Sequence, residues 1–323
     1  MRYRGRSVCL LSLTLGAAIT TDCPASNFLI AGRRCALASI SIQGRYELPD
    51  SKLAYHTVVH ALEASSGWTA QSRFAATVAH AINGHLPYAR YNEAGRTRIK
   101  SRSGSGVIER LVQDWLSTDL NPVVQIFRSQ TQTAKALHCY NAYNASANLA
   151  VRTTATTLVR SGGPTPIIYK RERLSAHEDP EPCRLGTFFV LSAVMDIVAR
   201  VEKNQAAPKI FNLPDIAIAL GVTRSASADV ATVFDMEGYV PVGEAARRIG
   251  CHQRTMERRL REEGLTAEAI RTATRLIRAT KRIRSCDSLT TIALEEGFSD
   301  QAQMTRAFRL SGGMAPSLLR MIS

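Results

Sequence analysis

The sequence predicts an α+β protein in which a helix-rich mixed N-terminal domain precedes an all-α C-terminal domain. Three observations carry this prediction. The length of 323 residues leaves room for about two domains that each bury a core. Strand-like segments occur only before residue 220, between segments of helical period. Residues 241–323 show only helical period, interrupted by glycines.

Composition and charge narrow the class of protein. A hydrophobic content of 45% and a charged content of 21% indicate a globular chain rather than a disordered one. The net charge of +14 favours an anionic partner, nucleic acid first and an anionic membrane second. Seven scattered cysteines show no spacing typical of a zinc site or a disulfide framework. We therefore expect reduced thiols in a cytoplasm, and no metal or other cofactor.

Residues 1–40 are predicted to be an N-terminal extension that is disordered or resembles a signal peptide. The first twenty, MRYRGRSVCLLSLTLGAAIT, place three arginines before an apolar run, but no small-residue cleavage site follows directly. Export or membrane anchoring is one interpretation, and a non-native or disordered extension is the other. The apolar segment 187–201 is too short for a membrane span and holds Asp196, so we expect a buried core helix there.

Residues 41–220 are predicted to form the mixed, helix-rich N-terminal domain. Amphipathic or apolar period predicts helices at 52–64, 69–83, 107–118, 131–150 and 187–201. Residues 92–106 are polar, basic and rich in glycine and serine, which predicts a loop, and β-prone runs predict strands at 156–160, 164–170 and 208–213. Residues 221–240 turn small and polar, so a linker is expected between this domain and the all-α domain at 241–323.

Two motifs in the N-terminal half suggest an alternative function as a DNA-associated enzyme. His56 and His60 share a helical face at a spacing that can bind zinc, but the Glu that a metalloprotease places after the first His is missing. Cys183 in the run Glu-Pro-Cys-Arg is similar to the Pro-Cys-His-Arg of DNA alkyl-transfer proteins, but no His follows it. Plain packing is the favoured interpretation of both motifs, and we predict that the protein is not an enzyme.

The C-terminal domain begins with two short helices joined by a turn at Gly250. VGEAARRIG places small apolar residues on one side, and CHQRTMERRLREEG places Met256 and Leu260 one helical turn apart as a matching seam. This pattern predicts a helix-turn-helix. Its second helix turns five polar or charged side chains outward: Gln253, Arg254, Glu257, Arg258 and Arg261.

The same pattern returns at residues 288–309. SLTTIALEEG predicts a first helix, and GFSDQAQMTRAF predicts a second, with Ser299 as its N-cap and Met304 and Phe308 facing inward. The outward face of this second helix carries Gln301, Gln303, Thr305, Arg306 and Arg309. Between the two units, residues 268–284 predict a helix of ~25 Å, which would set the two outward faces about one DNA turn, ~34 Å, apart.

Residues 241–320 resemble the AraC/XylS family of bacterial transcription regulators. IALEEGFSDQAQMTRAFRLSGGMAPSLLR follows the family signature I-A-x-x-x-G-F, a polar recognition helix, R-A-F, and then G-x-x-P-x-x-x-R. The sequence departs from the family pattern in a few places. Pro241 and His252 stand where Ser or Thr caps are usual, and Leu310 and Ser311 stand where a basic residue and an aromatic are usual.

The resemblance implies sequence-specific binding of double-stranded DNA in adjacent major grooves. It places base-reading residues at Arg254, Glu257 and Arg258 in the first unit and at Gln301, Ala302, Gln303 and Arg306 in the second. Glutamine suits adenine and arginine suits guanine, whereas Thr305 and Arg309 suit phosphate. The resemblance further implies that residues 41–220 form an effector-binding or dimerisation domain and that residues 241–323 form the DNA-binding domain. It gives a small-molecule effector, RNA polymerase and a second copy of the chain as candidate partners. A regulator of promoters belongs in the cytoplasm, which outweighs the signal-like start of the chain.

Overall fold

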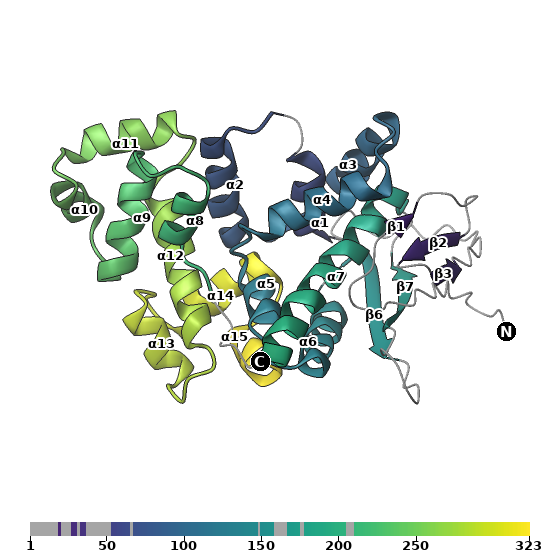
Figure 1. Ribbon diagram of the computed structural model, residues 1–323. Coiled ribbons are helices and arrows are strands. Elements are labelled where there is room, and N and C mark those ends of the chain that lie inside the picture. The colour runs from purple at the N-terminus through teal and green to yellow at the C-terminus, as the bar shows by residue number, and fades with distance from the viewer. Residues whose placement is uncertain are drawn as a thin grey trace. The chain divides into compact units, whose positions relative to one another are not determined.

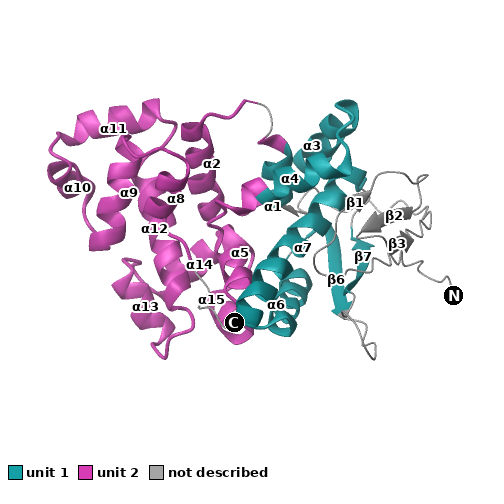
Figure 2. Ribbon diagram, viewed as in Figure 1, with its two compact units in different colours: residues 1–62, 86–113, 131–206 teal, residues 63–85, 114–130, 207–323 magenta. Residues whose placement is uncertain are grey.

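The computed structural model describes residues 19–20, 27–30, 33–36, 53–64, 67–147, 149–157, 167–174, 178–204 and 210–323. The chain folds into two compact units (Figure 2). Unit 1 comprises residues 1–62, 86–113 and 131–206, and unit 2 comprises 63–85, 114–130 and 207–323. The chain therefore passes from one unit to the other at five points, whereas the predicted domains are contiguous in sequence.

Most of the predicted extension at 1–40 lies outside the described residues. Within it the structure describes the strands β1 (Ile19–Thr20), β2 (Asn27–Ile30) and β3 (Arg33–Ala36), which pair antiparallel in that order. The signal-like segment before residue 19 lies outside the described part of the chain.

Unit 1 is mixed, as the sequence predicts. Its elements along the chain are β4 (Leu53–Tyr55), α1 (His56–Glu63), β5 (His85–Pro87), α3 (Tyr88–Lys100), α4 (Ser105–Leu116), α6 (Thr133–Ser146), β6 (Val151–Thr157), β7 (Ile167–Arg173) and α7 (Glu181–Asn204), with the ends of α1, β5 and α4 crossing into unit 2 (Figure 1). Strand β4 pairs with β5, and β6 pairs antiparallel with β7, with Val151 opposite Arg173. Helix α6 packs against β6 and α3 against β4, and α7 packs against both α3 and α6.

Two local predictions for this half are wrong. Residues 92–100 of the predicted loop belong to helix α3, because Tyr88, Tyr91 and Ala94 bury one of its faces. Residues 210–213 of the predicted strand are not a strand: the Asn212 side chain accepts a hydrogen bond from the backbone of Asp215 and caps the helix that begins at Leu213.

Helix α7 is the long apolar helix of unit 1 and extends the predicted segment 187–201 at both ends. It is long and apolar enough to cross a membrane by length and composition alone, but half of its most apolar stretch is buried within the protein. Phe189, Met195 and Val198 lie in the core, and burial raises the pKa of the Asp196 carboxyl. These contacts are those of a core helix.

Unit 2 is built almost entirely of helices. They are α2 (Ala70–Ile82), α5 (Pro122–Arg128), α8 (Leu213–Ala219), α9 (Ala226–Glu237), α10 (Val242–Arg248), α11 (Gln253–Glu262), α12 (Ala267–Arg282), α13 (Leu289–Glu295), α14 (Gln301–Gly312) and α15 (Pro316–Ile322). Helix α9 occupies most of the predicted linker at 221–240, because its buried side chains, Phe234 among them, pack against α12.

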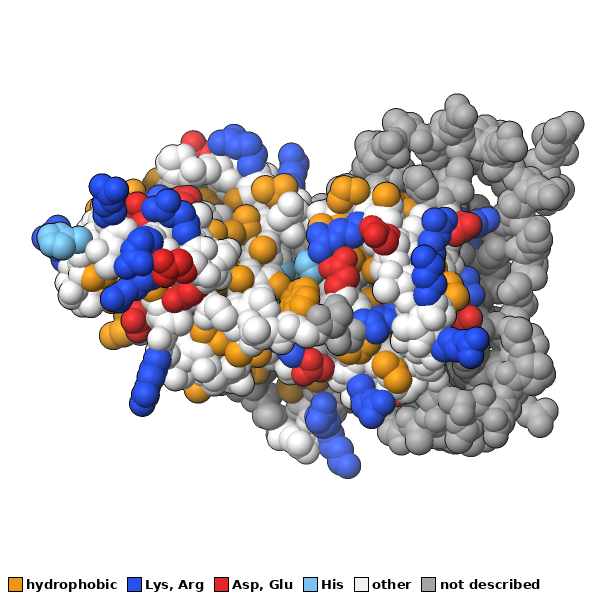
Figure 3. All heavy atoms as spheres, turned by 90° about the horizontal axis from the view of Figure 1, so that it is seen from above, with side chains coloured by type: hydrophobic (Ala, Val, Ile, Leu, Met, Phe, Trp, Pro, Cys, Tyr) orange, Lys and Arg blue, Asp and Glu red, His pale blue; other side chains and the backbone are white. Residues whose placement is uncertain are grey.

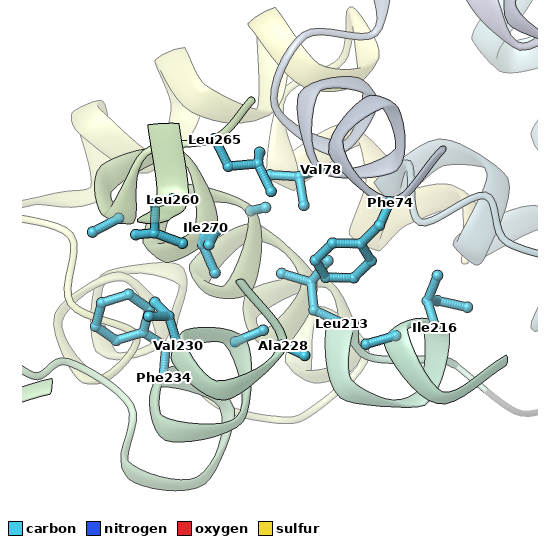
Figure 4. Close-up of a cluster of buried hydrophobic side chains, with 14 of the residues drawn as sticks. Phe74, Val78, Leu213, Ile216, Ala228, Val230, Phe234, Leu260, Leu265 and Ile270 are labelled. Atoms are coloured by element: carbon cyan, nitrogen blue, oxygen red, sulfur yellow. The ribbon is translucent and has the colours of Figure 1, made fainter. Parts of the chain in front are cut away.

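The core of unit 2 draws on both halves of the sequence. Figure 4 shows one cluster that contains Phe74 and Val78 of α2, Leu213 and Ile216 of α8, Phe234 of α9 and Ile270 of α12, with Phe74 beside Leu213 and Phe234 at the other end. Each of these six side chains is at most 1% exposed. Helix α2, which lies far from α12 in the sequence, is thus part of the core that supports the C-terminal helices.

Candidate nucleic-acid interface

Helices α10 and α11 form the first helix-turn-helix. Ala245 and Ala246 of α10 and Met256 and Leu260 of α11 are all at most 1% exposed, which is the predicted apolar seam. The turn between the helices passes through Gly250 at φ +77°, a left-handed conformation that glycine adopts without steric cost. The N-caps Pro241 and His252 make no side-chain capping bond, as their residue types imply.

The outward face of α11 carries the five predicted side chains, but its charges are partly paired. Gln253 Nε2 donates to Glu257 Oε1 at 2.7 Å, and Arg258 pairs with Glu262 at 2.8 Å. Arg261 Nε donates to the Glu257 carbonyl at 3.2 Å. Arg254 is exposed and makes no ion pair with the described residues. Figure 3 shows basic and acidic side chains interleaved over α10 and α11.

Helices α13 and α14 form the second helix-turn-helix, and the N-cap of α14 differs from the prediction. The cap is Asp300, not Ser299: its Oδ1 accepts a hydrogen bond from the Gln303 amide at 2.6 Å. That bond is the main reason why the pKa of the Asp300 carboxyl is lowered. The Ser299 hydroxyl instead donates to the Asp300 carboxylate at 3.2 Å. The residue one position later takes the cap because its extended backbone, φ −163° and ψ 171°, turns its carboxylate over the first turn.

The face of α14 opposite its core presents the predicted polar set. Gln301, Ala302, Arg306 and Arg309 are exposed and Gln303 and Thr305 are half-buried, while Met304 and Phe308 are fully buried beneath them. Neither arginine makes an ion pair within residues 210–323. Gln301 Oε1 accepts from the Thr290 hydroxyl at 2.9 Å, and Gln303 Oε1 accepts from the Ser299 amide at 2.7 Å. The side chain of Gln303 therefore completes the start of the helix.

Helix α12 joins the two helix-turn-helix units, and the basic side chains at its C-terminal end make bonds inside the protein. Arg278 Nε donates to Glu296 Oε2 at 2.6 Å, and its Nη1 donates to the Asp235 carbonyl at 2.6 Å. Arg282 bonds to Asp287 at 2.7 Å, to Glu295 at 2.5 Å and to Glu296 at 3.3 Å, and these bonds raise its pKa. Glu296 is only 3% exposed. These ion pairs hold the second helix-turn-helix against α12. Because they use basic side chains inside the protein, the surface of unit 2 is less basic than its composition alone would suggest.

Two acidic residues for which the sequence predicts no role hold helices of unit 2 together. Besides Glu296, Glu263 follows the end of α11 and accepts hydrogen bonds from the backbone amides of Ala226 and Ser227, each at 2.8 Å. It thereby satisfies the first two amides of α9, beside the N-cap Ser225, whose hydroxyl accepts from the Ala228 amide. Nothing in the local sequence distinguishes Glu263 from Glu262, because the partner amides lie more than thirty residues away.

Among the residues behind the alternative enzyme function, those that the structure describes form neither a metal site nor a nucleophile site. His60 is 9% exposed, the side chain of His56 lies outside the described residues, and the described residues contain no group of three metal-ligating side chains. Cys183 is fully buried, its thiol donates to the Tyr91 carbonyl at 3.2 Å, and burial raises its pKa. A buried thiol of raised pKa carries little thiolate and is a poor nucleophile.

Comparison with known proteins identifies the class of the C-terminal domain. Residues 245–321 match the family model described as a helix-turn-helix domain, and this segment is a helix-turn-helix domain of the AraC type. The match supports DNA-binding transcription regulation. No curated protein matches the chain. The crystal structure of the transcriptional regulator CdpR from Pseudomonas aeruginosa matches with a TM-score of 0.29 and 13% identity, covering 87% of this chain and 100% of that one. The assignment of the domain rests on residues 245–321 alone.

Proposed function

We propose that this protein is a transcription regulator that reads a bipartite DNA site with α11 and α14. One observation carries the proposal: two helix-turn-helix units on the single helix α12 each turn an exposed polar and basic face away from a buried apolar seam. Helix α12 has 16 residues, or about 24 Å at 1.5 Å per residue. That length suits two recognition helices in successive turns of one major groove.

In the second helix-turn-helix, Arg306 and Gln301 are the proposed base readers. Both lie on the exposed face of α14, and Arg306 has its full guanidinium available for the O6 and N7 atoms of guanine. Gln303 would have to release the Ser299 amide before it could contact adenine through both amide atoms, so a single hydrogen bond is its proposed contribution. Thr305 and Arg309 are proposed to contact phosphates, and Ala302 to contact a base edge through its methyl group.

In the first helix-turn-helix, Arg254 is the proposed main base reader, because it is exposed and has no carboxylate partner in the described chain. Arg258 would exchange its exposed pair with Glu262 for a phosphate or a base, and exposed pairs of this kind are worth little. Glu257 is held by Gln253 and is proposed to accept a hydrogen bond from cytosine N4. Gln253 and Arg261 flank this centre and complete the proposed contact surface.

Further parts of the proposal concern the rest of the chain. Unit 1 is proposed to sense a small-molecule effector or to dimerise, and RNA polymerase is the proposed partner at the promoter. The boundaries 41–220 for the sensing region and 241–323 for the DNA-binding domain remain proposals, as does a cytoplasmic location. The protein is proposed to act by binding, without catalysis or a cofactor.

Site selection from random duplex DNA tests the proposal. We expect the full-length protein to enrich a motif with two half-elements about one helical turn apart. Its affinity should fall steeply with salt because phosphate contacts release counterions. Arg306→Ala and Arg320→Ala each remove one positive charge, but only Arg306 lies on the proposed base-reading face, whereas Arg320 Nε bonds to the Ile283 carbonyl within unit 2. Only Arg306→Ala should therefore change the base preference. Absence of any enriched motif at low salt would refute the proposal.

A further inference from the structure

The C-terminal end of α14, the second recognition helix, is held by two helices from the N-terminal half of the chain. Ser311 of α14 is fully buried; its hydroxyl donates to the Ala81 carbonyl of α2 at 2.5 Å. The Ser311 carbonyl accepts from Asn121 Nδ2 at 2.8 Å. The Gly84 amide, just after α2, donates to the Leu310 carbonyl at 3.2 Å. All of these residues belong to unit 2.

The fit at this contact is too close for added side-chain atoms. A Cβ at Gly84 would lie 1.6 Å from the Ser311 carbonyl oxygen, and a Cβ at Gly312 would lie 2.4 Å from Val123 Cγ2. Backbone therefore lies directly against backbone. Ser311 departs from the aromatic of the family pattern, and its small side chain fits a contact that an aromatic ring would not enter.

The residues that contact α14 are themselves fixed. Asn121 Oδ1 accepts from the Val123 backbone amide at 3.0 Å and caps α5. The backbone amide of Asn121 donates to Asp119 Oδ1 at 2.9 Å. Asp119 also pairs with His80 Nε2 of α2 at 2.9 Å, and both side chains are 0% exposed. Residues 80–84 and 119–123, called the brace from here on, are therefore one hydrogen-bonded block between α2 and α5.

We propose that the brace positions the second recognition helix on DNA, so that reading of the half-site beneath α14 depends on the N-terminal half of the chain. This inference rests on the proposed function. A recognition helix discriminates bases only when its side chains keep a fixed register, and the brace fixes the end of α14 away from its N-cap. The chain runs from the brace into unit 1 at residues 85/86, 113/114 and 130/131. The family match at 245–321 contains none of these brace residues.

The test measures each half-site separately, by nuclease footprinting of the full-length protein on its selected bipartite DNA. Gly84→Ala forces backbone apart, and we expect protection of the second half-site to weaken by roughly tenfold or more. Ser311→Ala removes one hydrogen bond, and we expect a weakening of about fivefold there. Protection of the first half-site, beneath α11, should stay within about twofold in both variants.

Matched controls separate positioning from loss of fold. Gly106→Ala meets nothing within 4 Å, and Ser317→Ala removes an exposed hydroxyl of α15, so both should protect the two half-sites like the wild type. Gln71→Ala changes the other end of α2, where Gln71 bonds to Ser227 at 3.0 Å, and should spare the second half-site. Asn121→Asp keeps the acceptor that caps α5, removes the donor to the Ser311 and His80 carbonyls and buries a carboxylate near Asp119. The loss at the second half-site should therefore be larger than that of Ser311→Ala.

The outcomes distinguish this inference from the proposed function. Loss at the second half-site alone, in folded Gly84→Ala, Ser311→Ala and Asn121→Asp proteins, supports the brace. Equal loss at both half-sites would mean that these residues only stabilise unit 2, and unchanged footprints would mean that α14 needs no brace; either result overturns the inference and leaves the proposed function standing. A wild-type protein that protects no bipartite site would overturn the proposed function, and the brace inference with it.

Discussion

Replacement of Glu263 tests how helix α9 is attached to the first helix-turn-helix. Its carboxylate accepts from the amides of Ala226 and Ser227 at the first turn of α9, and from Gln71 Nε2 of α2 at 3.3 Å. Glu263→Ala leaves these donors without their acceptor. The adjacent Glu262→Ala is the control, because Glu262 is exposed and, among the residues that the structure describes, pairs only with Arg258.

The magnitude follows from the bonds that are lost. A hydrogen bond to a charged group contributes ~1.5–3 kcal/mol, and two bonds reach the α9 amides. Glu263 is half-buried, so water can replace part of this interaction. Loss of the carboxylate also relieves repulsion with Asp229, whose pKa is raised by burial and then by Glu263. We expect Glu263→Ala to lower the free energy of unfolding by about 2–3 kcal/mol, and Glu262→Ala by less than about 0.5 kcal/mol.

The two tryptophans make the assay specific to one unit. Trp68 and Trp115 are the only tryptophans in the sequence, both belong to unit 2, and their rings meet edge to face at 5.9 Å. Urea denaturation followed by tryptophan fluorescence therefore reports the unfolding of unit 2. If Glu263→Ala and Glu262→Ala had the same midpoint as the wild type, Glu263 would not hold the first turn of α9 in solution and the reasoning would fail.

Three further outcomes are expected. Arg306→Ala should relax base preference and cost ~1–3 kcal/mol on the best DNA site, whereas Arg309→Ala should weaken all sequences alike and reduce the salt slope by about 1; equal effects in a binding assay would refute this division. Burial lowers the pKa of His85 to about 4, so the folded state favours its neutral form. Its contribution of about 3 kcal/mol is present above pH ~6.5 and is lost as the pH falls toward 4, and urea midpoints of His85→Asn should show the shallower pH dependence. Mass-spectrometric mapping of thiol labelling should find Cys286, which is exposed, modified in the native protein and the buried Cys183 modified only after unfolding.

Local pattern was sufficient wherever both members of a contact lie close in sequence. The seam of Met256 and Leu260 against Ala246, and the burial of Met304 and Phe308, follow from helical spacing within each unit. Solvent exposure of Arg306 and Arg309 follows from the same spacing. The mixed character of the first half was also predictable, because its apolar runs change between helical and strand-like period. For these features, period alone decides which side chains are buried.

Errors arose where the partner of a residue lies far along the chain. Residues 92–100 are polar enough for a loop, but the segment is a helix because Tyr91 and Ala94 are buried on one side of it. Residues 226–237 are small and polar enough for a linker, but small side chains are what a helix needs to pack closely against α12. Composition describes the chain without its neighbours, and in both places the neighbours decided the outcome.

By itself, the sequence determined that the chain ends in two helix-turn-helix units, because each unit is specified by spacings of three and four residues that need no distant partner. Only the tertiary structure decided what supports these units. Glu296 holds Arg278 and Arg282, Glu263 holds the first turn of a helix that begins more than thirty residues earlier, and Ser311 lies against backbone 230 residues away. A hydrogen bond between distant residues leaves no period in the sequence, so it is found only once the chain has folded.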